Sequence, residues 1–384
     1  MDFNDTPEEA KFRKEAFEWL KANAPLKEGP KDGWRAASEE DGLKEVKVWQ
    51  KKLHEAGWAC MHWPKAFGGR ESTPIERVIW GQEVSKFKVP GGYLEIGQGM
   101  AGPVMMMYAT EEQKERYLPP LATGEEIWCQ LFSEPAAGSD VAGIKTKAEL
   151  DGDTWTINGQ KVWTSRAAHS DLMLLLARTT PADQVKKRTH GISTFLIDLR
   201  EAQNNGCTIT PIDAMINHNT TEVFFDNVPI PGDALIGEEG KGWTYAKGLL
   251  EHERTGLAGL SKSLVELEQL KEKARTIQRG NGNLMDEASY RSKVGELEID
   301  LLATEFTELR SLASAASGGE PGPESSILKL KGTEIKQRIQ KLTVEASGIY
   351  ASAWGDKGAG PSFAKGGTAG YLNSRYFTIY GGAS

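Results

Sequence analysis

Apolar residues recur at intervals of three and four between Ala288 and Ala316, which is the spacing of one face of an α-helix. Two more helices are predicted beside this one, from Trp243 to about Ser263 with a continuation to Gln278, and from about Glu324 to Ser347. We therefore predict a helical C-terminal domain over residues 241–384, with the apolar stripe in its core. The stripe consists of Val294, Leu297, Leu301, Leu302, Phe306, Leu309 and Leu312.

Three threonines mark helix starts in the first third of the chain. Thr6, Thr73 and Thr110 are each followed, three positions later, by Glu or Gln. This pattern is a capping box, in which each of the two side chains accepts a hydrogen bond from the backbone N–H of the other residue. Proline directly follows Thr6 and Thr73, at the first helical position, where its missing N–H has no partner to lose. We therefore predict a helical N-terminal domain over residues 1–126.

The middle of the chain contains short runs typical of strands. Asn158-Gly159 lies between two such runs, Thr154–Ile157 and Gln160–Trp163, and predicts a β-hairpin with a two-residue turn. We predict an antiparallel β domain over residues 127–240, and hence an α+β fold with this domain between two helical ones. Further strands are predicted from Asp171 to Arg178, from Ile192 to Leu199 and from Thr221 to Val228, with Pro229 and Pro231 ending the last one.

The charge balance excludes one class of function. The 384 residues carry 54 Asp and Glu against 46 Lys and Arg, a net charge of −8. This acidic balance argues against a nucleic-acid-binding protein, which usually presents a basic surface. The longest apolar run, Leu172 to Ala177, is too short to cross a bilayer, so we expect no membrane span. The acidic N-terminus lacks the basic and apolar regions of a signal peptide, so we expect a cytoplasmic protein.

The three cysteines, Cys60, Cys129 and Cys207, are far apart in sequence and form no C-x-x-C pair. We therefore expect buried free thiols rather than a disulfide framework or a zinc site. His252-Glu253 begins a zinc-binding H-E-x-x-H sequence, but Gly256 stands where the second histidine belongs, so no metal is predicted. The chain also lacks the glycine-rich sequences of a Rossmann dinucleotide site and of a P-loop.

Two segments of the middle region carry the candidate chemistry. Ser133 to Asp140, SEPAAGSD, is a loop of small residues that can bring backbone N–H groups and two hydroxyls close to a flat or anionic ligand. A plain turn capped by Ser139 and Asp140 explains this loop equally well on its own. Lys161 to Ser165, KVWTS, favours the ligand, because it adds an indole ring and two more hydroxyls to the same domain.

These motifs, in this order, resemble those of the acyl-CoA dehydrogenase family over essentially the whole chain. The family's E-P-x-x-G-S-D loop corresponds to Glu134–Asp140 and its W-x-[TS] motif to Trp163–Ser165. The passage from strand to helix is similar at Val223–Pro231 and Gly237–Trp243, and Ile379–Ser384 resembles the family's Y-[EG]-G-[TS]-S segment. The resemblance implies a helical, a β and a helical domain in that order, an acyl-CoA substrate and FAD as the cofactor.

The resemblance also assigns the contacts to the flavin. Ser133 and Ser165 would hydrogen-bond its pyrimidine edge and N5. Phe132 and Trp163 would line the isoalloxazine ring, and Ser139 would reach toward the pyrophosphate. Independently of the family, donors at these positions would stabilise negative charge that builds on the ring, and apolar walls would exclude water.

The reaction implied is α,β-dehydrogenation of an acyl-CoA thioester, in which a carboxylate removes the α-proton and the β-hydride passes to flavin N5. Many relatives carry this base directly after the tyrosine of the terminal motif, but this sequence has Gly381 after Tyr380. A second branch of the family uses a Glu before an Arg on the first helix after the β domain, which corresponds to Glu253 and Arg254. Glu253 is therefore the expected base, against the alternative of a surface glutamate paired with a cation. Arg254 would organise the CoA end of the site, Tyr380 would contact the substrate, and the N–H of Gly381 would polarise the thioester carbonyl.

Two family motifs that complete the FAD site of a neighbouring subunit are degraded in this sequence. Gly280–Asn283 follows Arg279 without the Phe-Gly of the R-x-x-F-G motif, and Glu345–Ile349 stands in place of the Q-x-x-G-G motif. A carboxylate near a pyrophosphate is unfavourable by charge. The hypothesis is therefore a catalytic subunit of a heteromer, whose second acyl-CoA dehydrogenase-like subunit supplies the missing contacts in a tetramer with two copies of each.

Within the family, the chain is similar to the large subunit of pimeloyl-CoA dehydrogenases and to subunits of heterotetrameric dehydrogenases of steroid side chains. This resemblance implies a bulky or dicarboxylic acyl group and an electron-transferring flavoprotein as the electron acceptor. Two alternatives stay open: a self-sufficient homo-oligomer that binds FAD through substitute contacts, and a non-catalytic partner subunit of the same fold. The fold alone is also compatible with a flavin oxidase or monooxygenase.

Overall fold

The computed structural model describes residues 5–28, 33–215, 219–257, 259–316, 324–352, 360–361, 364 and 367–383. The side chains of residues 250–257, 312–316 and 325 lie outside this description. Contacts between Cα atoms divide the chain into two compact units, each built from segments far apart in sequence. The first unit comprises Met1–Trp34, Ser72–Val89 and Arg254–Ser384, and the second comprises Arg35–Glu71 and Pro90–Glu253.

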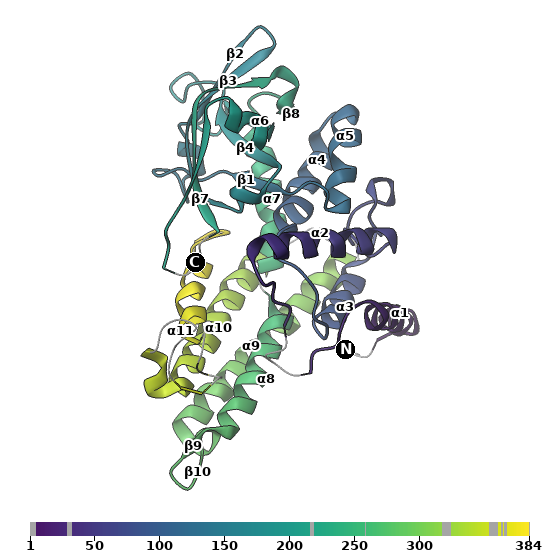
Figure 1. Ribbon diagram of the computed structural model, residues 1–384, viewed down its shortest axis with the longest axis vertical. Helices are drawn as coiled ribbons and strands as arrows, with labels where there is room; N and C mark the ends of the chain where they lie inside the picture. Colours follow the sequence, from purple (N-terminus) through teal and green to yellow (C-terminus); the bar gives the residue numbers. More distant parts are fainter. Residues whose placement is uncertain are drawn as a thin grey trace. The chain divides into compact units, whose positions relative to one another are not determined.

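An eight-stranded sheet forms much of the second unit (Figure 1). Its strands are β1 (Trp128–Leu131), β2 (Lys147–Asp151), β3 (Thr154–Ser165), β4 (Leu172–Arg178), β5 (Ile192–Asp198), β6 (Cys207–Pro211), β7 (Thr220–Pro231) and β8 (Leu235–Ile236). The hydrogen-bonded order is β6-β7-β3-β2-β4-β5-β8, and β1 pairs with β4. Most neighbours are antiparallel, as predicted, but β1 and β2 run parallel to β4, so the sheet is mixed.

The predicted turn at Asn158-Gly159 is wrong. β3 continues through both residues, and the turn that joins β2 to β3 lies at Gly152 and Asp153. β3 is paired on both edges, with β2 over its first half and with β7 over most of its length. Between β3 and β7, the N–H of Asn227 donates to Oδ1 of Asn158 at 2.9 Å, and Nδ2 of Asn158 donates to Oδ1 of Asn227 at 3.2 Å. The register of these two strands shifts near Gly159. Because β3 is hydrogen-bonded to a strand on each edge, it stays extended through Asn158-Gly159 as an irregular strand. A local sequence pattern does not reveal these two neighbouring strands.

Replacing Gly159 by Ala is expected to destabilise the protein by more than about 1 kcal/mol. Gly159 has a φ of +149°, and an added Cβ would lie 2.5 Å from Oγ1 and 2.7 Å from Cα of Thr146. Urea unfolding of the variant measures the loss. Gly138→Ala is the matched control, because a Cβ there meets no atom within 4 Å. Equal stability of the two variants would contradict the prediction.

The strand predicted at 221–228 extends to Pro231, so Pro229 lies within the strand and Pro231 is its last residue. β6 pairs only with residues 221–225 of β7, so the far part of β7 has one open edge. Proline has no N–H to donate, and an open edge requires no donor. The strands predicted around Leu172–Arg178 and Ile192–Asp198 are confirmed as β4 and β5.

Helices pack against both faces of this sheet. They include α2 (Glu39–Glu55), α4 (Gly102–Tyr108), α5 (Glu111–Thr123), α6 (Leu199–Asn204) and α7 (Gly242–Leu257). Along β4, Leu172, Leu174 and Leu176 belong to a buried cluster with residues of α4, α5 and α7. Met173 and Leu175, which point the other way, belong to a second cluster built from strands and α6. The alternation of β4 therefore divides the core into two layers.

The first unit is mainly helical. Its elements are α1 (Pro7–Asn23), α3 (Pro74–Val84), α8 (Leu260–Thr276), the short hairpin of β9 (Gln278–Arg279) and β10 (Gly282–Asn283), α9 (Ala288–Ala316), α10 (Glu324–Ser347) and α11 (Gly367–Asn373). α9 and α10 have the predicted bounds. The predicted continuous helix from Trp243 is interrupted, because Gly259, with a φ of +56°, precedes a new helix, α8. The capping boxes at Thr6, Thr73 and Thr110 are all confirmed.

Among the described side chains, which exclude Leu312, the apolar stripe of α9 forms core only in its first half. Val294, Leu297 and Leu301 are each 1% exposed and pack in one cluster with α8 and α10. Leu302 and Phe306 are 53% and 38% exposed, so the prediction that they form core is wrong. Consecutive helical residues point about 100° apart, so Leu301 and Leu302 cannot both face the same neighbours.

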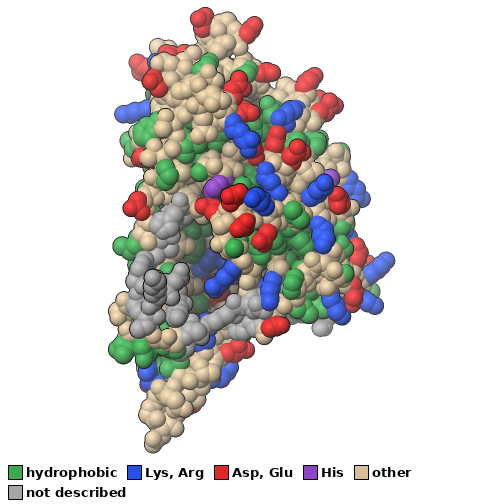
Figure 2. All heavy atoms as spheres, in the orientation of Figure 1, with side chains coloured by type: hydrophobic (Ala, Val, Ile, Leu, Met, Phe, Trp, Pro, Cys, Tyr) green, Lys and Arg blue, Asp and Glu red, His purple; other side chains and the backbone are tan. Residues whose placement is uncertain are grey.

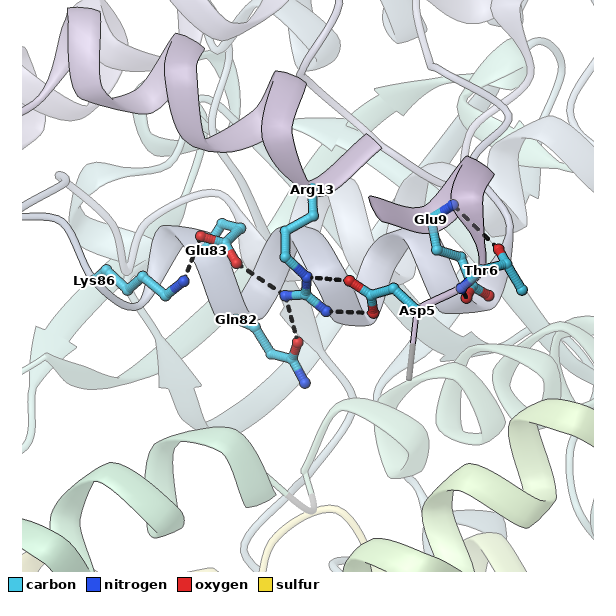
Figure 3. Close-up of polar contacts among 7 residues, drawn as sticks. All are labelled: Asp5, Thr6, Glu9, Arg13, Gln82, Glu83 and Lys86. Atoms are coloured by element: carbon cyan, nitrogen blue, oxygen red, sulfur yellow. Dashed lines mark hydrogen bonds and ion pairs between the residues drawn. The ribbon is translucent and has the colours of Figure 1, made fainter. Parts of the chain in front are cut away.

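A partly buried charge network fixes α1 to α3 (Figure 3). Arg13 donates to both carboxylate oxygens of Asp5, at 2.5 and 2.9 Å, and to Glu83 at 2.9 Å. Glu83 is 1% exposed and also pairs with Lys86 at 2.6 Å. The hydrogen bond from Arg13 lowers the pKa of Asp5. Two cations therefore compensate the buried carboxylate of Glu83.

None of the described helices is long and apolar enough to cross a membrane. Acidic and basic side chains are interspersed on the face shown in Figure 2. The three cysteines are buried and free, as predicted, and burial raises the pKa of each thiol to about 12.

Candidate functional site

The loop between β1 and β2 carries the first candidate motif. β5 occupies one edge of β4, and β1 and β2 follow each other along the opposite edge. In the loop, Glu134 and Ala137 close a tight turn, each N–H donating to the other residue's carbonyl at 3.0 Å. Ser139 and Asp140 are exposed and lead into the 3₁₀ turn η3 (Val141–Gly143), which has no side-chain cap. Backbone bonds, rather than a cap from Asp140, therefore close these turns.

A buried ion pair joins this loop to β3. Lys161 Nζ donates to Glu134 at 2.8 Å, and the two side chains are 0% and 7% exposed. The Glu134 carboxylate also accepts the N–H groups of Lys145 at 2.6 Å and Thr146 at 3.0 Å, while Lys161 donates to the Phe132 carbonyl at 3.2 Å. Burial raises the pKa of Glu134, but the charge of Lys161 and these hydrogen bonds outweigh it, so the pKa is lowered overall. The pair thus fixes both ends of the loop.

The second motif lies beside the first. The Val162 N–H donates to the Ser133 carbonyl at 2.9 Å, so β3 meets the loop one residue before Trp163. Trp163 and Arg166 have φ values of +60° and +64°, in the left-handed region that non-glycine residues rarely adopt. Such backbone strain is concentrated at functional sites, where the surroundings enforce it. The tertiary structure therefore brings Ser133 close to the W-T-S motif.

The side chains of these motifs present a flat aromatic surface beside hydroxyl groups. The Trp163 side chain is 64% exposed, which is unusual for an indole in a folded protein. Ser165 is also exposed and Ser133 is half-buried, whereas Phe132 is buried in the cluster beneath the helices. An exposed aromatic surface bordered by polar donors suits a flat ligand with a polar edge.

Some buried polar side-chain atoms of β1 and β3 have no hydrogen-bond partner in the described part of the chain. They include Trp128 Nε1, Gln130 Oε1 and Thr164 Oγ1. Each such atom costs about 1–3 kcal/mol. Sequence reasoning missed Gln130, although its polar side chain within an apolar strand was a usable signal. It also missed the pairing of Lys161 with Glu134, for which the sequence has no local signal.

The remaining candidates lie outside the sheet. Glu253 and Arg254 belong to α7, and their side chains lie outside the described part of the structure. Gly381 has a φ of +63°, which would strain any residue with a side chain. Tyr380 is 36% exposed and packs against Tyr376, with ring centroids 5.0 Å apart.

Sequence models of three domains of one family match most of the chain. The N-terminal domain of acyl-CoA dehydrogenases matches residues 6–125, the middle domain residues 129–228, and the C-terminal domain residues 240–384. Acyl-CoA dehydrogenase IpdE1 of Mycobacterium tuberculosis is 33% identical over 354 residues, which cover 90% of this chain and 86% of the relative. Acyl-CoA dehydrogenase FadE34 of the same organism is 34% identical over 320 residues, 81% of this chain and 42% of the relative.

Solved structures show the same fold. The Tcur3481-Tcur3483 steroid ACAD superposes with a TM-score of 0.83 at 26% identity, covering 100% of this chain and 95% of that one. The ChsE4-ChsE5 complex of Mycobacterium tuberculosis gives a TM-score of 0.80 at 24% identity, with coverage of 100% and 95%. The chain belongs to the acyl-CoA dehydrogenase family, whose members are flavoprotein oxidoreductases that act on CH–CH bonds.

Proposed function

We propose that this chain binds FAD and, as the catalytic subunit of a heteromer, converts a bulky or dicarboxylic acyl-CoA to its trans-2-enoyl-CoA. The observation that carries this proposal is the junction of the two motifs. The hydrogen bond from Val162 to Ser133, 2.9 Å long, joins the E-P-x-x-G-S-D loop to the W-T-S motif. A scaffold without a ligand has no use for an exposed indole held by strained backbone beside these hydroxyls.

The residues present fit FAD. The exposed indole of Trp163 offers a surface for the isoalloxazine ring, and Phe132, which is buried next to Ser133, is proposed to add to the apolar lining. Ser133 and Ser165 provide hydroxyls for the pyrimidine edge and N5. Ser139, exposed in the loop after β1, is the residue proposed to reach the pyrophosphate. FAD, when bound, supplies the acceptor for the hydride that leaves the β-carbon.

The chain's own residues would handle the proton and the thioester. We assign Glu253 the removal of the α-proton, and Arg254 the organisation of the CoA end of the substrate. Tyr380 would contact the substrate. The N–H of Gly381 would donate to the thioester oxygen and so stabilise the charge that develops there. An electron-transferring flavoprotein is the proposed electron acceptor.

Two features of the first unit support a heteromer. Glu345, which replaces the glutamine of a family motif, pairs with Lys293 at 2.8 Å instead of standing free for a neighbour's cofactor. Ile349, which replaces a glycine of the same motif, is 83% exposed. The motif is thus poorly suited to complete the FAD site of an identical neighbour, so a different subunit is proposed to do so.

An exposed apolar surface on α9 supports assembly with another subunit. Ile299, Leu302 and Phe306 are 69%, 53% and 38% exposed, and their spacing of three and four residues places them on one helix face. Contiguous exposed apolar side chains of this kind mark interaction surfaces. The Tcur3481-Tcur3483 steroid ACAD, whose fold the chain shares, carries two chain names, and its description supports a bulky steroid-like acyl group here.

The flavin content of the purified chain tests this proposal. We expect little FAD, by visible absorbance, when the chain is expressed alone, because the contacts from a neighbour are degraded. Co-expression with a second acyl-CoA dehydrogenase-like subunit should restore stoichiometric FAD. Stoichiometric FAD and full activity in the lone chain would contradict the heteromer and establish a homo-oligomer. Absence of FAD in every assembly would leave only the non-catalytic partner subunit.

A further inference from the structure

Arg178, the last residue of β4, is a buried cation bound almost entirely to main-chain carbonyls. Its side chain is 9% exposed. Nη2 donates to the carbonyl of Ala142 at 2.8 Å and to that of Arg188 at 3.2 Å, and Nε donates to the carbonyl of Ile144 at 3.2 Å. Nη1 donates to the carbonyl of Thr180 at 3.4 Å. The guanidinium therefore donates to four main-chain carbonyls.

These carbonyls belong to two loops that the sheet alone does not hold together. Ala142 and Ile144 lie in and directly after η3, which follows Ser139 in the loop between β1 and β2. Thr180 and Arg188 lie in the connection between β4 and β5. Arg188 also pairs with Asp140 at 2.8 Å, but both of these side chains are more than half exposed. Exposed pairs contribute little, so Arg178 is the main polar link between the loops.

The charge of Arg178 has no carboxylate partner within ion-pair distance in the described part of the chain. Burial, and then the like charge of Arg188, lower the pKa of Arg178, whereas the carboxylate of Glu134, beyond ion-pair distance, partly opposes this shift. An arginine nevertheless stays protonated at neutral pH, because its ordinary pKa lies so high. Burying a cation without an anion in direct contact costs free energy. An anionic ligand bound near this loop would offset part of that cost.

We propose that Arg178 is a positioning residue, which holds η3 and the preceding Ser139 in the geometry that binds the diphosphate of a dinucleotide. Its fixed charge also adds positive potential to this loop. The inference rests on the proposed function, since FAD is the dinucleotide that the chain is proposed to bind. Arg178 acts through the loop and not by contact with the reacting atoms.

Arg178→Met and Arg178→Lys test this inference in whichever assembly binds FAD. Arg178→Met should raise the dissociation constant for FAD by about tenfold or more, since it removes several charged hydrogen bonds. Its affinity for riboflavin, which lacks the diphosphate, should stay unchanged. Hydrogen exchange of residues 140–146 should accelerate in both variants, because lysine cannot reach four carbonyls. Arg178→Lys keeps the charge, so the salt dependence of FAD binding should persist in it and weaken in Arg178→Met.

Leu175→Ala is the matched control for stability. Leu175 is fully buried in the other layer of β4, so its truncation destabilises the same strand without touching the loop. It should leave the preference for FAD over riboflavin unchanged. If Arg178→Met behaves like Leu175→Ala in both binding and loop exchange, the inference is overturned and the proposed function stands. If wild-type protein binds no FAD in any assembly, both fail.

Discussion

Replacing Glu253 by Gln is expected to lower the rate of acyl-CoA dehydrogenation by about 10²- to 10⁴-fold, because a general base contributes an acceleration of this size. The amide has nearly the shape of the carboxylate but cannot take up the α-proton. FAD content should stay unchanged, since no proposed flavin contact involves this residue. Turnover of an acyl-CoA with an artificial electron acceptor, and the loss of flavin absorbance on adding substrate without acceptor, measure the effect.

Glu251→Gln is the matched control for this prediction. It makes the same chemical change on the same helix, two residues earlier, and therefore about 200° away around the helix axis. It should keep wild-type activity. Equal losses in the two variants would point to a general effect on α7, and full activity of Glu253→Gln would remove this residue from the mechanism.

Replacing Lys161 by Met is expected to destabilise the protein by about 3–5 kcal/mol, because it leaves a buried carboxylate without its cation. Lys161 and Glu134 are 0% and 7% exposed and lie 2.8 Å apart, so no water takes the place of the ammonium. Urea unfolding at pH 7 measures the loss. The loop should also become less ordered, because Lys161 donates to the Phe132 carbonyl as well.

The effect of Lys161→Met should shrink as the pH falls. In the wild type the pKa of Glu134 is lowered below its ordinary value of 4.5, and burial lowers the pKa of Lys161 to about 8, so both groups are charged at pH 7. Between pH 4.5 and 7 the pair's stabilisation is complete, and it is lost as the pH falls through the lowered pKa of Glu134. Without the cation, burial raises the pKa of Glu134. The folded variant then binds a proton before the unfolded chain does, and gains stability as the pH falls through that raised pKa. The two curves should approach each other at acidic pH.

Arg188→Met is the control for this second prediction. It breaks the ion pair with Asp140, which lies in the same loop as Glu134. The side chains of Asp140 and Arg188 are 59% and 58% exposed. The expected cost is about 1 kcal/mol or less. The double variant Lys161→Met with Glu134→Gln should recover part of the lost stability, since the uncompensated charge is gone. A Lys161→Met variant as stable as Arg188→Met would refute the argument.

Features that depend on neighbours in sequence were predictable. The capping boxes at Thr6, Thr73 and Thr110 form because each involves groups three residues apart. The bounds of α9 follow in the same way from an apolar repeat within one helix. The loop after β1 and the W-T-S motif could also be recognised as candidate ligand-binding segments. Their residue types and order, small residues followed by an indole and hydroxyls, are visible in the sequence without knowledge of the fold.

Features that depend on partners far away in sequence were decided by the tertiary structure. Asn158-Gly159 has the local signal of a turn, yet pairing with β2 and β7 on both edges keeps β3 extended through it. The sequence has no local pattern that predicts the pairing of Glu134 with Lys161. The two residues form a buried ion pair because the loop packs on β3. The burial of Arg178 was likewise not predictable. A charged residue at the end of an apolar strand is expected to be exposed, but here two loops cover it. The sequence by itself thus determined helix starts and chemical identities, which are local, whereas pairing, burial and charge compensation required the fold, because they join groups that the chain holds far apart.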